Sequence, residues 1–404
     1  MEATAEQAVE KAHGEIWRRF IDRHNVMLDF TELDGSVSIP TPEECRAGMP
    51  NALGWWSPIE NGAMFNGLYM EGMINRWRLT RAQADREKAR RLAAGLMFLS
   101  GLSEVRGFIG RGVATDGKAH YPMGSNDQTM PWLYGLWRYA QSGIPDAAER
   151  GRIETRMVEV MEVIHGSNWR IPAEPPFNFR GDFGMITWEG APRMLFVLKA
   201  MQQLTSDAKW GRLYQDALRE GPSDGGNNRL SVCERGMVFQ ERHRHSWTGS
   251  VATAALRGLW EMEQDEQLRE AYARGLRASA ALAAEGLPLC RQFDNDDRRK
   301  FDGDWRKLNQ WWKPQQTEQE AVALAERQSR ELNRLSPCRP YELTFVREPL
   351  FAAWVVTLCP DRAVVGQHRS AVVEAISHYR YERLHYSFFA AESAWYRLSM
   401  ADQR

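Results

Sequence analysis

Two carboxylic acids occur where predicted helices begin, a position from which a side chain can reach into a shared site. Glu60 follows the tryptophan pair of GWWSPIENGAMFNG, and Asp127 belongs to the segment PMGSNDQTMPW. General acid/base catalysis needs one carboxylic acid that stays protonated near neutral pH and a second carboxylate that activates water. We therefore expect Asp127 to be the acid and Glu60 to be the base or to orient water. Asp182 and Glu189, before a third helix, are reserve candidates.

Polar and aromatic side chains accompany these acids in the segments before other helices of low charge. Arg111 lies between two glycines, which suits a fixed cation that holds a carboxylate or hydroxyl group through its N–H fork. The faces of Trp188 and Trp247 offer platforms for a sugar ring. The predicted substrate-binding residues are Trp56, Arg111, His120, Tyr121, Asn126, Gln128, Trp188, His245, Trp247, Arg347, His385 and Tyr386.

Each of these residues also has a purely structural interpretation. Asn126 and Asp127 are residue types that cap helix N-termini. Glu60 suits the positive end of a helix dipole, and Trp56 could simply fill the centre of the fold. The hypothesis of a site therefore depends on the convergence of many such residues.

A second mechanism would use histidine. His245 and His385 each precede a low-charge helix, and a pair of imidazoles with pKa values near neutrality could move a proton at a sugar carbon. Either histidine could instead be a hydrogen-bonded pocket or core residue. This pair would also leave the acids of the first mechanism without a role.

The sequence predicts no metal site and no cofactor. His243 and His245 are two residues apart, which does not suit a helical ligand pair, and HExxH is absent. The acidic stretch FDNDDRRKFDGDW matches a calcium loop poorly, because the glycine and final glutamate of such a loop are out of place. P-loop, GxGxxG and GxSxG patterns are missing as well.

The elements that would position these residues are helices of two kinds. Segments that begin near residues 61, 127, 184, 247, 347 and 386 carry few charges, as in QTMPWLYGLWRYA, which is typical of helices buried on all sides. Segments that begin near 84, 148, 207, 266 and 364 have one charged face. The two kinds alternate, and the first four low-charge helices recur about every 60 residues.

This alternation predicts a closed ring of helical hairpins. Six low-charge helices would form the inner layer, and the N-terminal helix over 5–24 would complete the outer layer. We therefore expect an all-α (α/α)6 toroid, one domain over 1–404, with short β-hairpins in the loops at the active-site end. The segment 286–345 would be an insertion over the mouth of the ring. An open helical solenoid is the alternative.

Composition limits the class of function. The chain has 404 residues with 52 basic and 53 acidic side chains, so a concentrated positive surface for nucleic acid is not expected. No apolar stretch has the length of a membrane span. Five scattered cysteines predict no disulfide framework, which favours a reduced, cytoplasmic protein. The aromatic C-terminal helix is compatible with a homo-oligomer.

Two segments carry a resemblance to known proteins. WWSPIENGAMFNGLYMEGMINRW and GFIGRGVATDGKAHYPMGSNDQTMPWLYGLWRY resemble the six-hairpin glycosidase-type superfamily, as does the helix rhythm. That superfamily includes unsaturated glucuronyl hydrolases and other glycoside hydrolases, and also enzymes of the acylglucosamine epimerase type. The resemblance implies the toroidal fold and a carbohydrate substrate. It matches no complete catalytic signature, so it assigns no catalytic residue.

We therefore expect a glycoside hydrolase that acts on a small oligosaccharide, including one that contains a uronate, by carboxylate acid/base catalysis. The first alternative is a sugar epimerase or isomerase that uses the histidine pair. The second is a non-catalytic helical binding protein, in which the loop acids would be interchangeable caps.

Overall fold

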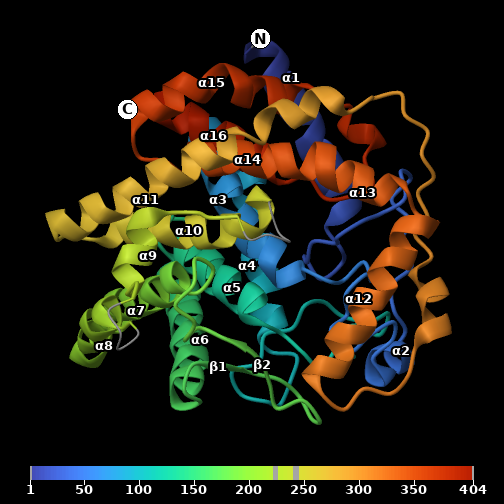
Figure 1. Cartoon of the computed structure of the whole chain (residues 1–404), viewed down its shortest axis with the longest axis horizontal. Helices are drawn as coiled ribbons and strands as arrows, with labels where there is room; N and C mark the ends of the chain where they lie inside the picture. The colour runs from blue at the N-terminus through green and yellow to red at the C-terminus, as the bar shows by residue number, and fades with distance from the viewer. Residues whose placement is uncertain (1, 222–225, 240–244, 403–404) are drawn as a thin grey trace.

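The protein is built almost entirely of α-helices, which confirms the predicted class. The computed structural model describes residues 2–221, 226–239 and 245–402, so His243 lies outside the described residues (Figure 1). The low-charge helices are α3 (Gly62–Thr80), α5 (Asn126–Ala140), α7 (Ala191–Thr205), α10 (Ser246–Met262), α14 (Glu348–Thr357) and α16 (Ala390–Asp402). Those with a polar face are α1 (Glu2–Glu15), α4 (Gln83–Leu99), α6 (Ala147–Gly166), α8 (Ala208–Arg219), α11 (Glu266–Ala284) and α15 (Arg362–Ser377).

Shorter elements lie between these helices. They are α2 (Pro42–Ala47), α9 (Arg229–Arg235), α12 (Glu318–Leu335) and α13 (Cys338–Glu342), with the antiparallel strands β1 (Arg170–Pro172) and β2 (Phe179–Asp182). Irregular turns of helix are Ile16–Phe20, Leu287–Gln292, Trp305–Trp311, Leu343–Arg347 and Tyr381–Arg383. Within the described residues, no helix combines the length and apolarity that a membrane crossing needs.

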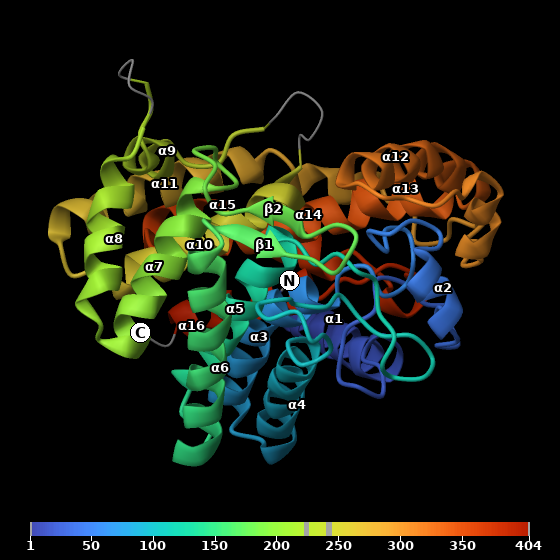
Figure 2. The same ribbon diagram turned by 90° about the horizontal axis from the view of Figure 1, so that it is seen from below.

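The low-charge helices pack on one another in the middle of the molecule. α3 lies between α5 and α16, α14 lies between α16 and α10, and α7 contacts both α10 and α5. The helices with a polar face pack behind them: α4 on α3, α6 on α5 and α7, α8 on α7, α11 on α10 and α14, α15 on α14, and α1 on α15 and α16. Figure 2 shows α4, α6 and α8 on the outside of α3, α5 and α7.

Glycine allows α3 and α5 to approach closely. A Cβ atom at Gly67 would lie 2.0 Å from the carbonyl oxygen of Pro131, and one at Gly135 would lie 2.6 Å from the Cα atom of Gly67. Backbones can come this near only where no side chain intervenes. The contact brings the N-terminal ends of the two helices together, and with them Glu60 and Asp127.

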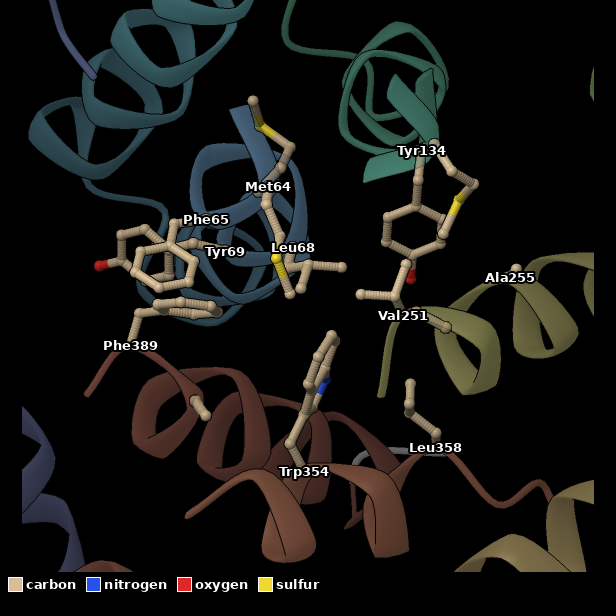
Figure 3. Packing of buried hydrophobic residues seen from close by; sticks show 14 of the residues in the cluster. Met64, Phe65, Leu68, Tyr69, Tyr134, Val251, Ala255, Trp354, Leu358 and Phe389 are labelled. Atoms are coloured by element: carbon tan, nitrogen blue, oxygen red, sulfur yellow. The ribbon is translucent and has the colours of Figure 1, made fainter. Parts of the chain in front are cut away.

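Apolar side chains from the low-charge helices fill the space between them. Figure 3 shows Leu68 of α3, Val251 of α10 and Trp354 of α14 converging on a common centre, with Tyr134 of α5 beside them. All four residues are at most 1% exposed. The middle of the helix assembly is therefore a packed core, and it supports whatever lies at its ends.

An ionic network closes the end of the core that lies towards the C-termini of these helices. Glu71 of α3 pairs with Arg138 of α5 and Arg397 of α16, while Glu261 of α10 pairs with Arg138, Arg257 and Arg397. Every side chain in the network is at most 25% exposed. The charges of Arg138 and Arg397 outweigh burial and keep the pKa of Glu71 below its ordinary value.

The segment 286–345 contains the helix predicted near 317–335, which is α12. Thr317 and Glu320 form a capping box at its start. The indole of Trp56 donates to the carbonyl oxygen of Ala325 at 2.8 Å, and Gln328 joins α12 to residues 50 and 51. α12 thus holds the loop that carries Trp56.

Candidate functional site

A cavity of about 380 Å³ lies where the N-terminal ends of α3, α5 and α10 meet. Met64 of α3 and Val251 of α10 line it and also belong to the core, so the packed centre forms its apolar base. Among the described residues its wall contains five arginines and four acids: Arg111, Arg180, Arg193, Arg339, Arg347, Asp29, Glu60, Asp127 and Glu189.

The cavity wall includes both acids predicted to be catalytic, Glu60 and Asp127. It also includes five of the predicted binding residues: Trp56, Arg111, Trp247, Arg347 and Tyr386. Of the reserve acids, Glu189 is in the wall and Asp182 is not. Residues from segments far apart in the sequence therefore share one site.

Asp127 is held as an ionised carboxylate. Its Oδ1 accepts a hydrogen bond from Nη1 of Arg193 at 2.6 Å, and the Arg193 side chain is only 3% exposed. Enclosure raises the pKa of Asp127, but the guanidinium of Arg193, aided by Arg111, outweighs this effect and keeps that pKa below its ordinary value. A carboxylate in this state is better suited to act as a general base than as a proton donor.

Asp29 has an environment that raises its pKa, the opposite of the effect on Asp127. It was not among the site residues predicted from the sequence. Its carboxyl oxygens accept hydrogen bonds from the backbone and side-chain amides of Asn61 at 2.8 and 2.6 Å. Burial, together with the negative charge of Glu60, raises the pKa of Asp29 well above its ordinary value. The signal that could have found it is a lone acid within the apolar stretch VMLDF.

Arg111 organises backbone around these acids. It donates to the carbonyl oxygens of Met123, Glu60 and Gly124 at 2.9 to 3.1 Å. Burial lowers the pKa of Arg111 to about 10. Because most of its donors are engaged, Arg111 joins the loop before α5 to the start of α3, a role different from the predicted grip on a ligand.

Two tryptophans of the cavity wall, the predicted platform Trp247 and the predicted binding residue Trp56, each carry a guanidinium on one face. The Arg347 guanidinium carbon lies 3.9 Å from the ring centroid of Trp247, and that of Arg339 lies 4.6 Å from the ring centroid of Trp56. Arg339 and Arg193 are cavity residues that sequence reasoning missed. No local pattern distinguishes them from the other arginines of the chain.

Several predicted binding residues lie outside the cavity wall. Tyr121 donates to the carbonyl oxygen of Met49, and Gln128 accepts from the backbone N–H of Met64 at 3.1 Å, so both hold the scaffold in place. The side-chain amide of Asn126 donates to the backbone carbonyl oxygen of Asp182. His120 contacts the carboxylate of Glu174 at 3.1 Å, and Trp188 is buried in the core. These residues support the site rather than face its contents.

The two histidines of the alternative mechanism are also outside the wall of the cavity. His245 is exposed at the N-cap position of α10. The His385 ring stacks on Phe301 with 3.9 Å between centroids, and Nδ1 lies 3.2 Å from the carbonyl oxygen of Thr31. Burial lowers the pKa of His385 to about 4, which leaves it neutral at physiological pH.

One cluster near the cavity has residue types that could bind a metal. Ligand atoms of Cys338, Glu342 and His385 lie within 4.8 Å of one another. The Cys338 thiol donates to Glu342, and the same carboxylate accepts the backbone N–H groups of His385 and Tyr386. Protein donors thus already occupy the carboxylate, which holds Tyr386 at the cavity wall.

No protein-family model matches the chain, and no curated protein sequence matches it. The chemistry of the cavity is therefore the basis on which a function can be assigned.

Proposed function

We propose that the protein is a glycoside hydrolase whose active site is the cavity at one end of an (α/α)6 toroid. The order of helix contacts supports the toroid, because it runs from α3 through α5, α7, α10, α14 and α16 back to α3. Helices with a polar face pack behind this inner set. The superfamily resemblance of the first 140 residues implies the same architecture.

The observation that carries the proposal is the opposite protonation preference of two acids in one cavity. Burial and Glu60 favour the neutral form of Asp29, whereas Arg193 favours the ionised form of Asp127. Environments that push two pKa values apart are how enzymes assign a general acid and a general base. Cleavage of a glycosidic bond needs such a pair.

In the proposed reaction Asp29 gives its proton to the glycosidic oxygen as the bond from that oxygen to the anomeric carbon breaks. The oxygen of a water molecule bonds to the same carbon, and the Asp127 carboxylate takes a proton from that water. Proton exchange with solvent then restores both acids. Glu60 acts through its charge on Asp29, so the acid role first expected for Asp127 moves to Asp29.

The alternatives have less support. The cavity wall contains neither His245 nor His385, so no observation favours proton transfer by a histidine pair. A non-catalytic toroid would have interchangeable acids and a mouth filled by tryptophan. A cavity of about 380 Å³ with differently tuned acids counts against that class.

The test is an activity screen of the full chain against aryl glycosides of neutral sugars, aryl uronides, unsaturated uronides and free aldoses. We expect release of the leaving group, reduced about 10²- to 10⁴-fold in Asp29→Asn and in Asp127→Asn. Asp216→Asn is the matched control, because Asp216 is exposed on α8, and its activity should equal that of the wild type.

A second readout does not need a substrate. In a ¹³C NMR titration of labelled aspartates, one carboxyl should stay protonated well above the usual range, and its signal should vanish in Asp29→Asn. An ordinary titration of Asp29, or interconversion of a free aldose without any bond cleavage, would overturn the proposal.

A further inference from the structure

Two arginines of the cavity, Arg339 and Arg347, form no ion pair with any residue that the structure describes. Arg180 pairs with Glu318 at 2.9 Å, and Arg193 pairs with Asp127. In the described part of the chain, no acidic group lies within ion-pair distance of Arg339 or Arg347. These two cations are therefore available to something that enters the cavity.

Arg347 is enclosed and unsatisfied. Its Nε is buried and has no hydrogen-bond partner among the described residues. The neighbouring carboxylate of Glu348 is already engaged, because it accepts the backbone N–H groups of Ser246 and Trp247 at the start of α10. A buried N–H donor without an acceptor is unfavourable, and a ligand that supplies one would be stabilised.

The guanidinium group of Arg339 also has N–H donors that no described residue accepts. One of its N–H groups donates to Oδ1 of Asn333 at 2.7 Å, and its others reach no acceptor in the described residues. Trp56 and Trp247 hold the two guanidinium groups by cation–π contact, which restricts their orientation before any ligand arrives. Preorganised guanidinium forks bind carboxylate and sulfate-type groups well.

The excess of positive charge in the cavity wall also favours an anionic ligand. Burial, followed by the positive charge of Arg339, lowers the pKa of Arg347 to about 10. The two cations thus repel each other in a site of low dielectric constant. The wall has five arginines and four acids, and the raised pKa of Asp29 lowers its negative charge further.

We infer that Arg339 and Arg347 bind an anionic substituent of the sugar, either a carboxylate or a sulfate ester. The acidic side chains that act most strongly on Arg347 are Glu60 and the proposed proton donor Asp29, ahead of Glu348, so the anion would be on the ring next to the bond that breaks. This inference rests on the proposed function, because it names the substrate class of the same cavity.

The test measures binding and not turnover. D-Glucuronate, D-galacturonate, D-glucose 6-sulfate, D-glucose and D-galactose are titrated into the full chain at constant ionic strength, with calorimetry or ligand-observed NMR as the readout. We expect at least one charged sugar to bind about tenfold more tightly than its neutral counterpart. Preference for the uronates or for the sulfate identifies which anion the site takes.

Three variants make the result specific. Arg347→Gln should bring charged and neutral sugars to within about twofold of each other, and Arg347→Lys should recover only part of the preference. Arg330→Gln removes the same charge from an exposed position of α12 and should change nothing. Equal binding of charged and neutral sugars, no binding of any charged sugar up to about 10 mM, or a preference that survives Arg347→Gln would overturn the inference.

The outcomes also separate the two proposals. Tight binding of a charged sugar without cleavage of any glycoside would support the proposed anion site and contradict the proposed hydrolase activity. Cleavage of charged glycosides at unchanged rate in Arg347→Gln would support the hydrolase and contradict the anion site.

Discussion

Glu342 shows how a single buried acid can govern stability around the cavity. It accepts the backbone N–H groups of His385 and Tyr386, and no lysine or arginine of the described residues pairs with it. Burial raises the pKa of Glu342 from 4.5 to about 7, although the hydrogen bonds act in the opposite direction. Between these values the folded protein therefore holds a proton on Glu342 that the unfolded chain has lost.

The expected result is a stability that falls as pH rises. Below about pH 4.5 the protonated Glu342 makes its full contribution to the free energy of unfolding. That contribution is lost as pH rises through about 7, which lowers the free energy of unfolding by on the order of 3 kcal/mol. Denaturant unfolding of the wild type between about pH 5 and pH 8 should show a downward slope that Glu342→Gln reduces. His385 titrates in both proteins, so their difference isolates Glu342. Glu326→Gln, an exposed change on α12, should leave the slope as it is.

At the scale of elements, α12 is fixed through one glutamine. The Gln328 side chain is fully buried; it donates to the carbonyl oxygens of Pro50 and Leu308 and accepts from the side-chain amide of Asn51 at 2.9 Å. These bonds connect α12 to the loop that carries Trp56. The position of one cavity wall thus depends on a contact outside the cavity.

Gln328→Leu should keep the volume and remove all three hydrogen bonds. We expect a loss of about 2–4 kcal/mol in the free energy of unfolding, because buried polar groups of the loop lose their partners. Hydrogen exchange should accelerate across 318–335. Gln319→Ala, on the exposed face of the same helix, should change stability by less than about 0.5 kcal/mol. Equal effects of the two substitutions would show that Gln328 does not anchor α12.

At the scale of the whole molecule, the ionic network joins four of the low-charge helices. Arg138 lies between the two acids Glu71 and Glu261, so its removal leaves buried negative charges without compensation. Arg138→Leu should lower the free energy of unfolding by about 3–5 kcal/mol, and adding Glu261→Leu should recover part of the loss. Arg274→Leu, in an exposed pair, should cost less than about 1 kcal/mol. A double variant no more stable than Arg138→Leu alone would argue against charge as the cause.

Helices could be predicted from the sequence because their signals are local. The predicted starts near 61, 84, 127, 148, 247, 266 and 364 fall within two residues of the observed ones, since apolar periodicity depends only on neighbouring residues. The short α9 was not predicted, because seven residues give little periodicity. The gathering of Glu60 and Asp127 in one cavity was predicted through the helix starts.

The state of each acid could not be predicted in the same way. The pKa of Asp127 is lowered because Arg193 contacts it, and the pKa of Asp29 is raised because it is buried and faces the charge of Glu60. Those partners are distant in the sequence, and no spacing rule connects them. Residue types could therefore indicate where the site lies, but not which acid carries the proton.

The contact of α1 with α15 and α16 determines when the protein can finish folding during its synthesis. Residues 2–15 leave the ribosome well before residues 362–402, so the buried face of α1, with Ala5, Val9 and Ala12, stays uncovered until α15 and α16 have emerged. Incomplete chains with exposed apolar surface are prone to association. Nascent chains stalled before α16 should therefore depend on chaperones and remain sensitive to proteases, whereas the released chain should not.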